Sequence, residues 1–245
     1  MCANIARATI LALAVWISAG TTPAKAGDLA DFNAAVETAA AHNRVAIGYL
    51  RTGNVDLASL ELDRLRAAWT QLATRFTAKR PDAFDGNPRY GNLFTGVSAR
   101  LVAADIMLKS GRPDTAGSSL SAIRDDLYDL RKASGIVVLA DCVRDANTVM
   151  DAFMAYNDRA LDFGKPETRF GVASTAAIYG YVLERCDGIA GEAIRQQPEF
   201  RRLVDGAKAS LALIPKAIAT RDADLLHRLL IELRSFDNLL AFRFG

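Results

Sequence analysis

Apolar residues recur at spacings of three and four along nearly the whole chain, and this periodicity limits the fold more than any other feature. Because a helix has 3.6 residues per turn, such spacing places the apolar side chains on one helical face. Alternating runs of β-branched residues, which predict strands, do not occur. The sequence therefore predicts an all-α fold. In the last predicted helix the buried stripe consists of Leu226, Leu229, Leu233, Phe236 and Leu240.

Glycine, proline and capping residues interrupt this pattern and divide the chain into about eight antiparallel helices. At Gly53-Asn54 one helix ends and the next begins, because glycine favours a helix end and asparagine a cap. Pro113 and Pro166 favour helix starts, and Pro215 predicts a kink. The helices are expected at about 28–52, 55–79, 89–110, 113–133, 137–163, 166–186, 198–219 and 222–242.

Similar turns in the two halves of the chain suggest an internal duplication. The turn segments 107–116 and 217–226 share a local pattern and lie 110 residues apart, and Gly164 lies 111 residues after Gly53. This spacing predicts two tandem four-helix units, 27–134 and 136–245. The alternative is one continuous array of helical hairpins.

Two families resemble these hairpins locally. The last hairpin is similar to the end of a haem-less cytochrome c′-type four-helix bundle, with an acidic turn before an amphipathic helix that ends in Phe242-Arg243. That family attaches haem through Cys-x-x-Cys-His, whereas this chain has apolar and acidic residues over 236–240, so no covalent haem and no cofactor is expected. Four residues have the small-aromatic-Gly-Ala spacing of a tetratricopeptide hairpin, which the first turn resembles: Ala46, Tyr49, Gly53 and Ala58.

Residues 1–26 have the parts of a secretory signal peptide. Arg7 forms a short basic region, an apolar stretch runs from 9 to 20, and small residues precede Ala26, after which we expect cleavage. The apolar stretch is too short to span a membrane, and no comparable run follows. The mature chain is therefore expected to have no membrane span and to be localised in the periplasm.

Cleavage also changes the charge of the chain. Arg7 and Lys25 are the only charged residues of the signal peptide and account for the whole formal net charge of +2. The remainder is neutral, with charges of both signs interspersed. This balance argues against a nucleic-acid partner or an anionic membrane surface, which favour basic proteins. It leaves room for a local charged patch.

Cys142 and Cys186 are the only cysteines after cleavage, and they predict a disulfide. They lie 22 residues on either side of Gly164, so an antiparallel hairpin turning there brings them level with each other. The even count and an oxidising compartment favour pairing. The alternative is a redox or metal-binding thiol pair, which is less favoured because the spacing is not Cys-x-x-Cys and no histidine is near in sequence.

Candidate ligand-binding side chains are few. His42 lies on the border of an apolar stripe with Tyr49 two turns on, and a bundle interior can hold a metal or small ligand at such a place. The alternative is a border histidine hydrogen-bonded to a neighbour. Arg234 or Arg243 could bind a carboxylate or phosphate through its planar guanidinium group. The alternative for Arg234 is an i,i+3 surface ion pair with Asp237.

The sequence contains no nucleophile with its base and no phosphate-binding glycine loop, so no catalytic residues are predicted. The leading interpretation is a non-enzymatic periplasmic binding or scaffold protein that presents a helical groove to a protein or peptide partner. The alternative is a carrier of a small ligand, or of a non-covalently held metal, related to cytochrome c′-like bundles. The sequence does not identify a metal.

Overall fold

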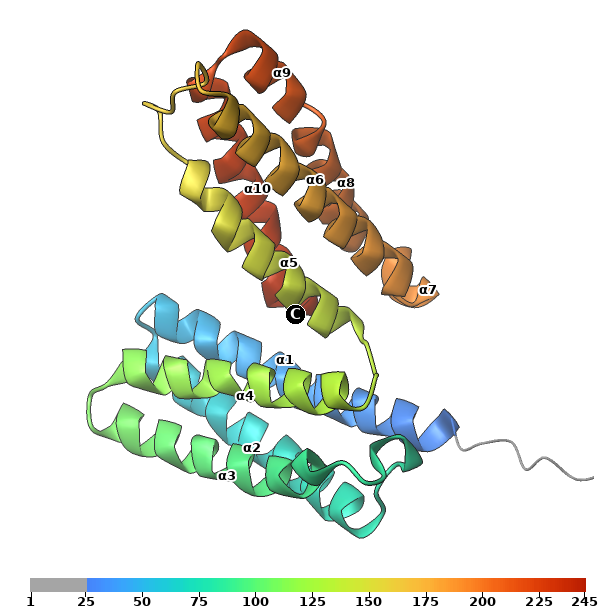
Figure 1. Ribbon diagram of the computed structural model, residues 1–245. Coiled ribbons are helices and arrows are strands. Elements are labelled where there is room, and N and C mark those ends of the chain that lie inside the picture. The colour runs from blue at the N-terminus through green and yellow to red at the C-terminus, as the bar shows by residue number, and fades with distance from the viewer. Residues whose placement is uncertain (1–25) are drawn as a thin grey trace, which may run out of the picture.

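The structure of the chain is a computed structural model that describes residues 26–245 (Figure 1). The predicted signal peptide, except for Ala26, lies outside the described residues. Residues 26–245 form helices and no strands, which confirms the all-α prediction. Across this range, no helix combines the length and the apolar character needed to cross a membrane.

Ten α-helices and two short 3-10 helices follow one another along the described part of the chain. They are α1 (Ala26–Arg51), α2 (Val55–Ala78), η1 (Asp82–Phe84), α3 (Pro88–Lys109), α4 (Pro113–Ala133), α5 (Leu139–Phe153), η2 (Met154–Tyr156), α6 (Pro166–Ile189), α7 (Glu192–Arg195), α8 (Pro198–Leu211), α9 (Ile214–Thr220) and α10 (Ala223–Phe244). We call residues 26–133 the first unit and residues 139–245 the second unit.

Residues with a left-handed backbone end the first helix of several hairpins. Gly53, between α1 and α2, has a φ of +77°, and Gly111, between α3 and α4, has a φ of +69°. Glycine enters this conformation without steric cost, so the chain can reverse in a short turn. The turn between α9 and α10 places Arg221 in the same region, with a φ of +53°.

The first unit buries an aromatic cluster at one end of its hydrophobic core. The ring of Phe32 on α1 lies 5.2 Å from that of Phe76 and 5.0 Å from that of Phe84, both in edge-on geometry. The Tyr90 hydroxyl donates a hydrogen bond of 2.8 Å to the Phe76 carbonyl oxygen. Edge-on ring contacts add to the stabilisation from burial, so this cluster holds η1 against α1.

The second unit has a separate hydrophobic core, and the predicted disulfide crosses it. Cys142 on α5 and Cys186 on α6 are bonded, with their Cα atoms 5.4 Å apart, which confirms the pairing. On the other side of this core, α8 packs closely on α10 at Gly206. A Cβ atom at Gly206 would lie 2.6 Å from the Phe236 ring, so only glycine allows this approach.

The predicted fifth helix was too long, since α5 ends at Phe153 and not near 163. The Asp158 carboxylate accepts a hydrogen bond of 2.8 Å from the Ala160 amide, and the Asp162 carboxylate accepts one of 2.8 Å from the Gly164 amide. Such side-chain bonds to the local backbone replace the helical hydrogen bonds. Residues 157–165, between η2 and α6, are therefore a loop.

The predicted seventh helix is broken rather than kinked. It ends as α8 at Leu211 and resumes as α9 at Ile214, with Pro215 in the first turn of α9. Proline lacks the amide hydrogen that a continuous helix needs at this point, but it is tolerated in a first turn.

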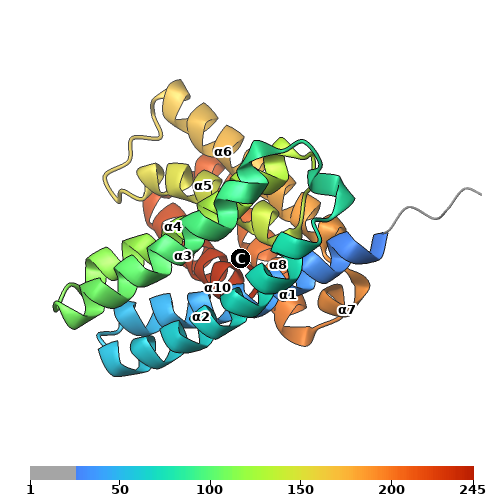
Figure 2. The same cartoon turned by 90° about the horizontal axis from the view of Figure 1, so that it is seen from below.

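One end of the second unit contacts the first unit. Figure 1 shows the C-terminal end of α10 and the start of α5 next to α1 and α4, and Figure 2, seen from below, shows α10 behind the helices of the first unit. Gly48 on α1 permits the approach of α10, because a Cβ atom there would lie 3.1 Å from the Phe242 ring. The interface thus joins the α1–α4 face of the first unit to one end of the second.

Candidate ligand-binding cavity

A cavity of about 650 Å³ lies in this interface, and we call it the inter-unit cavity. Its walls come from α1, α2 and α4 of the first unit and from α5, α6, α7 and α10 of the second, together with the linker at Val137 and Val138. Pockets that hold small organic ligands have volumes of about 300–1,000 Å³ and form preferentially where domains meet. Size and position both suit a small ligand.

The wall is largely apolar. The apolar side chains larger than alanine that line the cavity are Val36, Ile47, Leu65, Trp69, Ile123, Leu127, Val137, Val138, Leu139, Ile189, Ile194, Phe242 and Phe244. Leu65 and Trp69 are core residues of the first unit, so the cavity reaches from the interface into the interior of that unit. An apolar ligand portion would be removed from water there.

Four buried polar atoms without a hydrogen-bond partner belong to residues of this wall. They are Asn33 Oδ1, Asn43 Oδ1, Trp69 Nε1 and Arg124 Nε, out of six such side-chain atoms among the described residues. Asn43 and Trp69 are only 5% and 2% exposed. Buried polar groups in proteins are nearly always paired, because leaving one unpaired costs about 1–3 kcal/mol. Unmet hydrogen-bonding capacity is therefore concentrated in residues that line this one cavity.

The orientation of Asn43 follows from its second contact. Its Nδ2 donates a hydrogen bond of 3.0 Å to the Leu120 carbonyl oxygen on α4. Only the amide nitrogen can donate to a carbonyl, so this bond determines which atom of the side chain is Oδ1. The free Oδ1 is therefore an acceptor and Trp69 Nε1 a donor, each on a residue that lines the cavity.

Basic side chains outnumber acidic ones in the wall. The arginines are Arg44, Arg51, Arg124, Arg131 and Arg144, and the carboxylate side chains are Glu37 and Asp125. Gly245 also lies in the wall, and its oxygen accepts a hydrogen bond of 2.7 Å from Arg44 Nη1. The carboxylates are already paired, since Arg44 Nη2 donates to Glu37 Oε1 at 2.5 Å and Arg144 Nε donates to Asp125 Oδ1 at 2.8 Å. The cavity is thus a positive patch in a chain that is neutral after the predicted cleavage.

Arg131 illustrates how this interface neutralises a buried arginine. It reaches from α4 to Asp141 on α5, where Nε and Nη2 donate to the two carboxylate oxygens at 2.7 and 2.5 Å. Both side chains are buried. This fork-to-fork geometry suits a charge pair away from water.

Arg124 also lies on α4 and lines the cavity, but it has no carboxylate at hydrogen-bond distance. Its Nη1 donates to the Asn147 side-chain oxygen at 2.9 Å and its Nη2 to the Ala140 carbonyl oxygen at 3.4 Å, and both acceptors are uncharged. Burial, reinforced by the charge of Arg144, lowers the pKa of the Arg124 guanidinium to about 10. The group is therefore still cationic at neutral pH, with its Nε–H unpaired.

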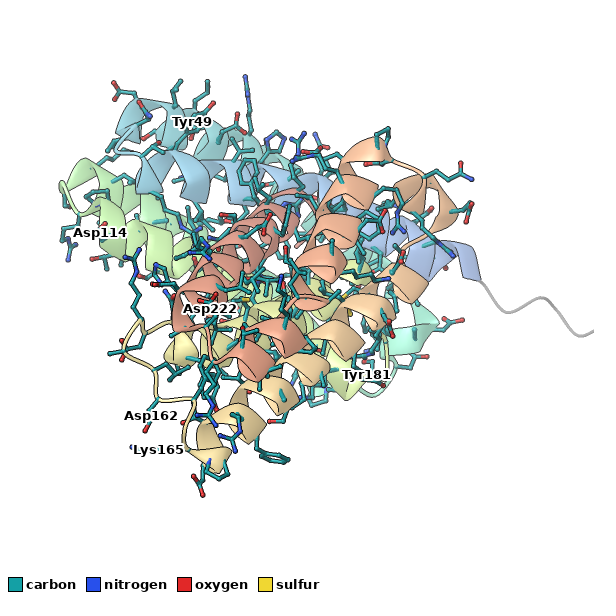
Figure 3. The ribbon with its side chains drawn as sticks, turned by 90° about the horizontal axis from the view of Figure 1, so that it is seen from above. Tyr49, Asp114, Asp162, Lys165, Tyr181 and Asp222 are labelled. Atoms are coloured by element: carbon teal, nitrogen blue, oxygen red, sulfur yellow. A yellow bond between two sulfur atoms is a disulfide. The ribbon has the colours of Figure 1, made fainter. Side chains whose placement is uncertain are left out.

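The sequence-predicted residues His42 and Tyr49 are not part of the wall of this cavity. His42 Nδ1 lies 2.7 Å from Glu61 Oε2 on α2, and Arg64 donates to the other Glu61 oxygen at 2.6 Å. Burial acts to raise the pKa of the Glu61 carboxyl, but the hydrogen bonds from His42 and Arg64 together lower it. Tyr49 packs at the edge of the first core, and Figure 3 places it far from Asp222 of the second unit.

Arg234 and Arg243 lie on α10 and form ion pairs. Arg234 donates to Asp151 at 2.6 Å and to Asp237 at 3.4 Å, whereas Arg243 bonds Glu199 at 2.7 Å. The pair of Arg234 with Asp237 is not a surface pair, because Asp237 is 1% exposed. The structure does not gather the four predicted residues into one site.

Among the residues described, no group of three or more histidine, cysteine, aspartate and glutamate side chains is arranged to hold a metal ion. The second histidine, His227, contacts the Asn157 side-chain oxygen through Nδ1 at 2.6 Å.

Sequence reasoning missed the cavity arginines. Arg124 and Arg131 are seven residues apart on α4, which places them two turns apart on one face. That face lies beside the core stripe of Leu120 and Leu127, and an arginine pair there signals a second contact surface. The partner of this surface comes from the other unit, so the spacing alone does not reveal the cavity.

No protein-family model, curated protein or solved structure matches the chain. The two hairpin resemblances and the internal duplication stay predictions, and the function has to be argued from the geometry of the cavity.

Proposed function

We propose that this chain is an exported, non-enzymatic binding protein that holds a small organic ligand in the inter-unit cavity. The observation that carries the proposal is a largely apolar cavity of about 650 Å³ between the two units, four of whose wall residues have a buried polar atom without a partner. Apolar walls with a few placed polar groups are the usual composition of small-ligand sites. The predicted signal peptide and the Cys142–Cys186 disulfide support a periplasmic location, because disulfides persist in oxidising compartments.

The proposal is tested with N-phenyl-1-naphthylamine, a neutral aromatic probe whose fluorescence rises in apolar surroundings. We expect the mature protein to bind one probe molecule per chain. Ala40→Trp adds a large side chain at the half-buried α1 wall of the cavity and should reduce binding at least tenfold. Ala99→Trp, at an exposed position on α3 outside the cavity, is the matched control and should bind as the parent does.

Two results would count against the cavity as the site. One is the absence of saturable probe binding to the parent protein. The other is equal binding by the Ala40→Trp and Ala99→Trp variants, which would mean that the probe adheres to the outer surface. Circular dichroism of each variant checks that its helices are intact.

A scaffold role is the second candidate function, and one surface favours it. Phe170, Ile178 and Tyr181 on α6 are 75%, 52% and 68% exposed, at spacings that place them along one side of the helix. Tyr181 lies at the outer side of the second unit (Figure 3). Exposed apolar rows of this kind commonly mark protein contacts. A photo-crosslinking residue at position 170 should then capture one defined partner in periplasm, and Tyr181→Ser should abolish the capture.

A further inference from the structure

We infer that the ligand of the inter-unit cavity carries an anionic group, a carboxylate or an equivalent oxyanion, and that Arg124 holds this group while the apolar wall holds the rest. The inference rests on the proposed function and names the ligand class. It is based on the hydrogen-bond partners of the arginines in the interface, which are carboxylates for Arg44, Arg131 and Arg144 but uncharged groups for Arg124.

Arg124 has no carboxylate at hydrogen-bond distance. Arg44, Arg131 and Arg144 each have a carboxylate within hydrogen-bond distance, at 2.5 to 2.8 Å. Arg124 has an amide oxygen and a backbone carbonyl instead, and its Nε is buried with no partner. A partly buried charge without a carboxylate at hydrogen-bond distance is only weakly compensated. An oxyanion in the cavity would supply the counter-charge.

Arg124 bridges the units, since it extends from α4 to Asn147 and Ala140 on α5. Arg131 makes the same bridge with a paired carboxylate, so bridging alone does not require an uncompensated charge. The two contacts of Arg124 instead hold the guanidinium in place.

Asn147 is the positioning residue in this arrangement. Its side-chain oxygen accepts from Arg124 at 2.9 Å, and its side chain also hydrogen-bonds the buried Asp237. Two contacts to charged partners restrain the amide. A restrained amide holds Arg124 in one orientation, and a pre-organised donor loses less entropy when an anion binds.

The remaining wall is mostly apolar. Trp69, Asn33 and Asn43 also line the cavity, and each has a buried polar atom without a protein partner. The surrounding side chains are aliphatic and aromatic, so the rest of the ligand is apolar. An amphipathic acid matches this combination better than a neutral hydrocarbon, which leaves the donors unpaired, or a cation, which Arg124 repels.

The test displaces N-phenyl-1-naphthylamine at pH 7.5 with three probes of equal chain length: decanoate, decan-1-ol and decyltrimethylammonium. Decanoate is expected to displace the probe at a concentration about tenfold or more below that of decan-1-ol, because hydrogen bonds to a charged group are the stronger ones. Decyltrimethylammonium should be the weakest. Arg124→Gln should remove the preference for decanoate while retaining probe binding, and Arg124→Lys should keep part of it.

Arg100→Gln is the matched control, because Arg100 pairs with Asp126 on α4 and does not line the cavity. This variant should keep the full preference. Equal displacement by decanoate and decan-1-ol in the parent, or an unchanged preference in Arg124→Gln, overturns the inference and leaves the proposed function standing. If the parent does not bind the probe at all, both fail. If Arg124→Gln does not fold, Arg124→Lys is measured in its place, and an undiminished preference for decanoate in that variant overturns the inference.

Discussion

Asp237 should make the protein more stable as the pH falls from 7.5 to 5. This carboxyl is 1% exposed in the core of the second unit, where the Tyr179 hydroxyl lies 3.3 Å and Arg234 Nη1 3.4 Å from its oxygens. Burial raises its pKa from 3.8 to about 6, against the opposing hydrogen bonds from Asn147 and Tyr179. The folded state therefore holds this proton more tightly than the unfolded chain does.

The magnitude follows from the pKa difference. Each pKa unit corresponds to about 1.4 kcal/mol, so keeping Asp237 ionised costs the folded state about 3 kcal/mol at pH 7.5. A raised pKa adds stability below the unfolded value of 3.8, and this stability is lost as the pH rises through 6. Between pH 7.5 and pH 5 the gain should be about 1.4 kcal/mol.

The assay is urea unfolding followed by circular dichroism at both pH values. Asp237→Asn, which cannot ionise, should lack the gain of about 1.4 kcal/mol that the parent shows. Asp224→Asn removes an exposed carboxylate from the same helix and should retain it. If Asp237→Asn and the parent gain equally on acidification, Asp237 does not titrate as its burial requires and the reasoning is refuted.

Three further changes test the disulfide, the turn between α9 and α10, and the buried ion pair between the two units. Reducing the Cys142–Cys186 disulfide should lower the unfolding free energy by about 4 kcal/mol, since it opens a loop with a sequence separation of 44, and a loss under about 1 kcal/mol in urea unfolding would contradict this. Arg221→Gly should raise the melting temperature, because it relieves a left-handed residue at a gain of about 0.5 kcal/mol, and a lower melting temperature would be inconsistent with the turn. Arg131→Met should cost about 3–5 kcal/mol by stranding Asp141, whereas the double change Arg131→Met with Asp141→Leu should cost far less; equal losses would mean that the pair is not buried.

Much of this fold could be predicted from local sequence. Helical periodicity and the turn glycines Gly53 and Gly111 act over a few residues, so the helices of the first unit begin and end close to their predicted positions. The disulfide was predictable for a similar reason, because an antiparallel hairpin relates Cys142 to Cys186 by simple counting from its turn.

The errors arose where side chains compete with the backbone. Leu161 and Phe163 continue the apolar spacing past the end of α5, and Phe163 is indeed buried. However, the Asp158 and Asp162 carboxylates accept hydrogen bonds from nearby backbone amides. The apolar periodicity of the sequence does not show that these bonds replace a helix. The apolar pattern reports which side chains become buried, but not whether a helix carries them.

The cavity itself could not be predicted because its parts come together only across the interface. Asn43 and Trp69 belong to the first unit, whereas Phe242 and Ala140 belong to the second. In sequence, Trp69 resembles an ordinary core residue and Arg124 an ordinary surface residue. Only the tertiary arrangement leaves Trp69 Nε1 and Arg124 Nε buried without partners.

The most direct test of the central claim is a crystal structure of the mature protein grown with saturating decanoate. We predict electron density for one decanoate per chain in the inter-unit cavity, with its carboxylate at hydrogen-bond distance from Arg124 and its chain along the apolar wall beside Trp69. Density for decanoate on the outer face of α6, or a cavity without it at saturation, would contradict the account.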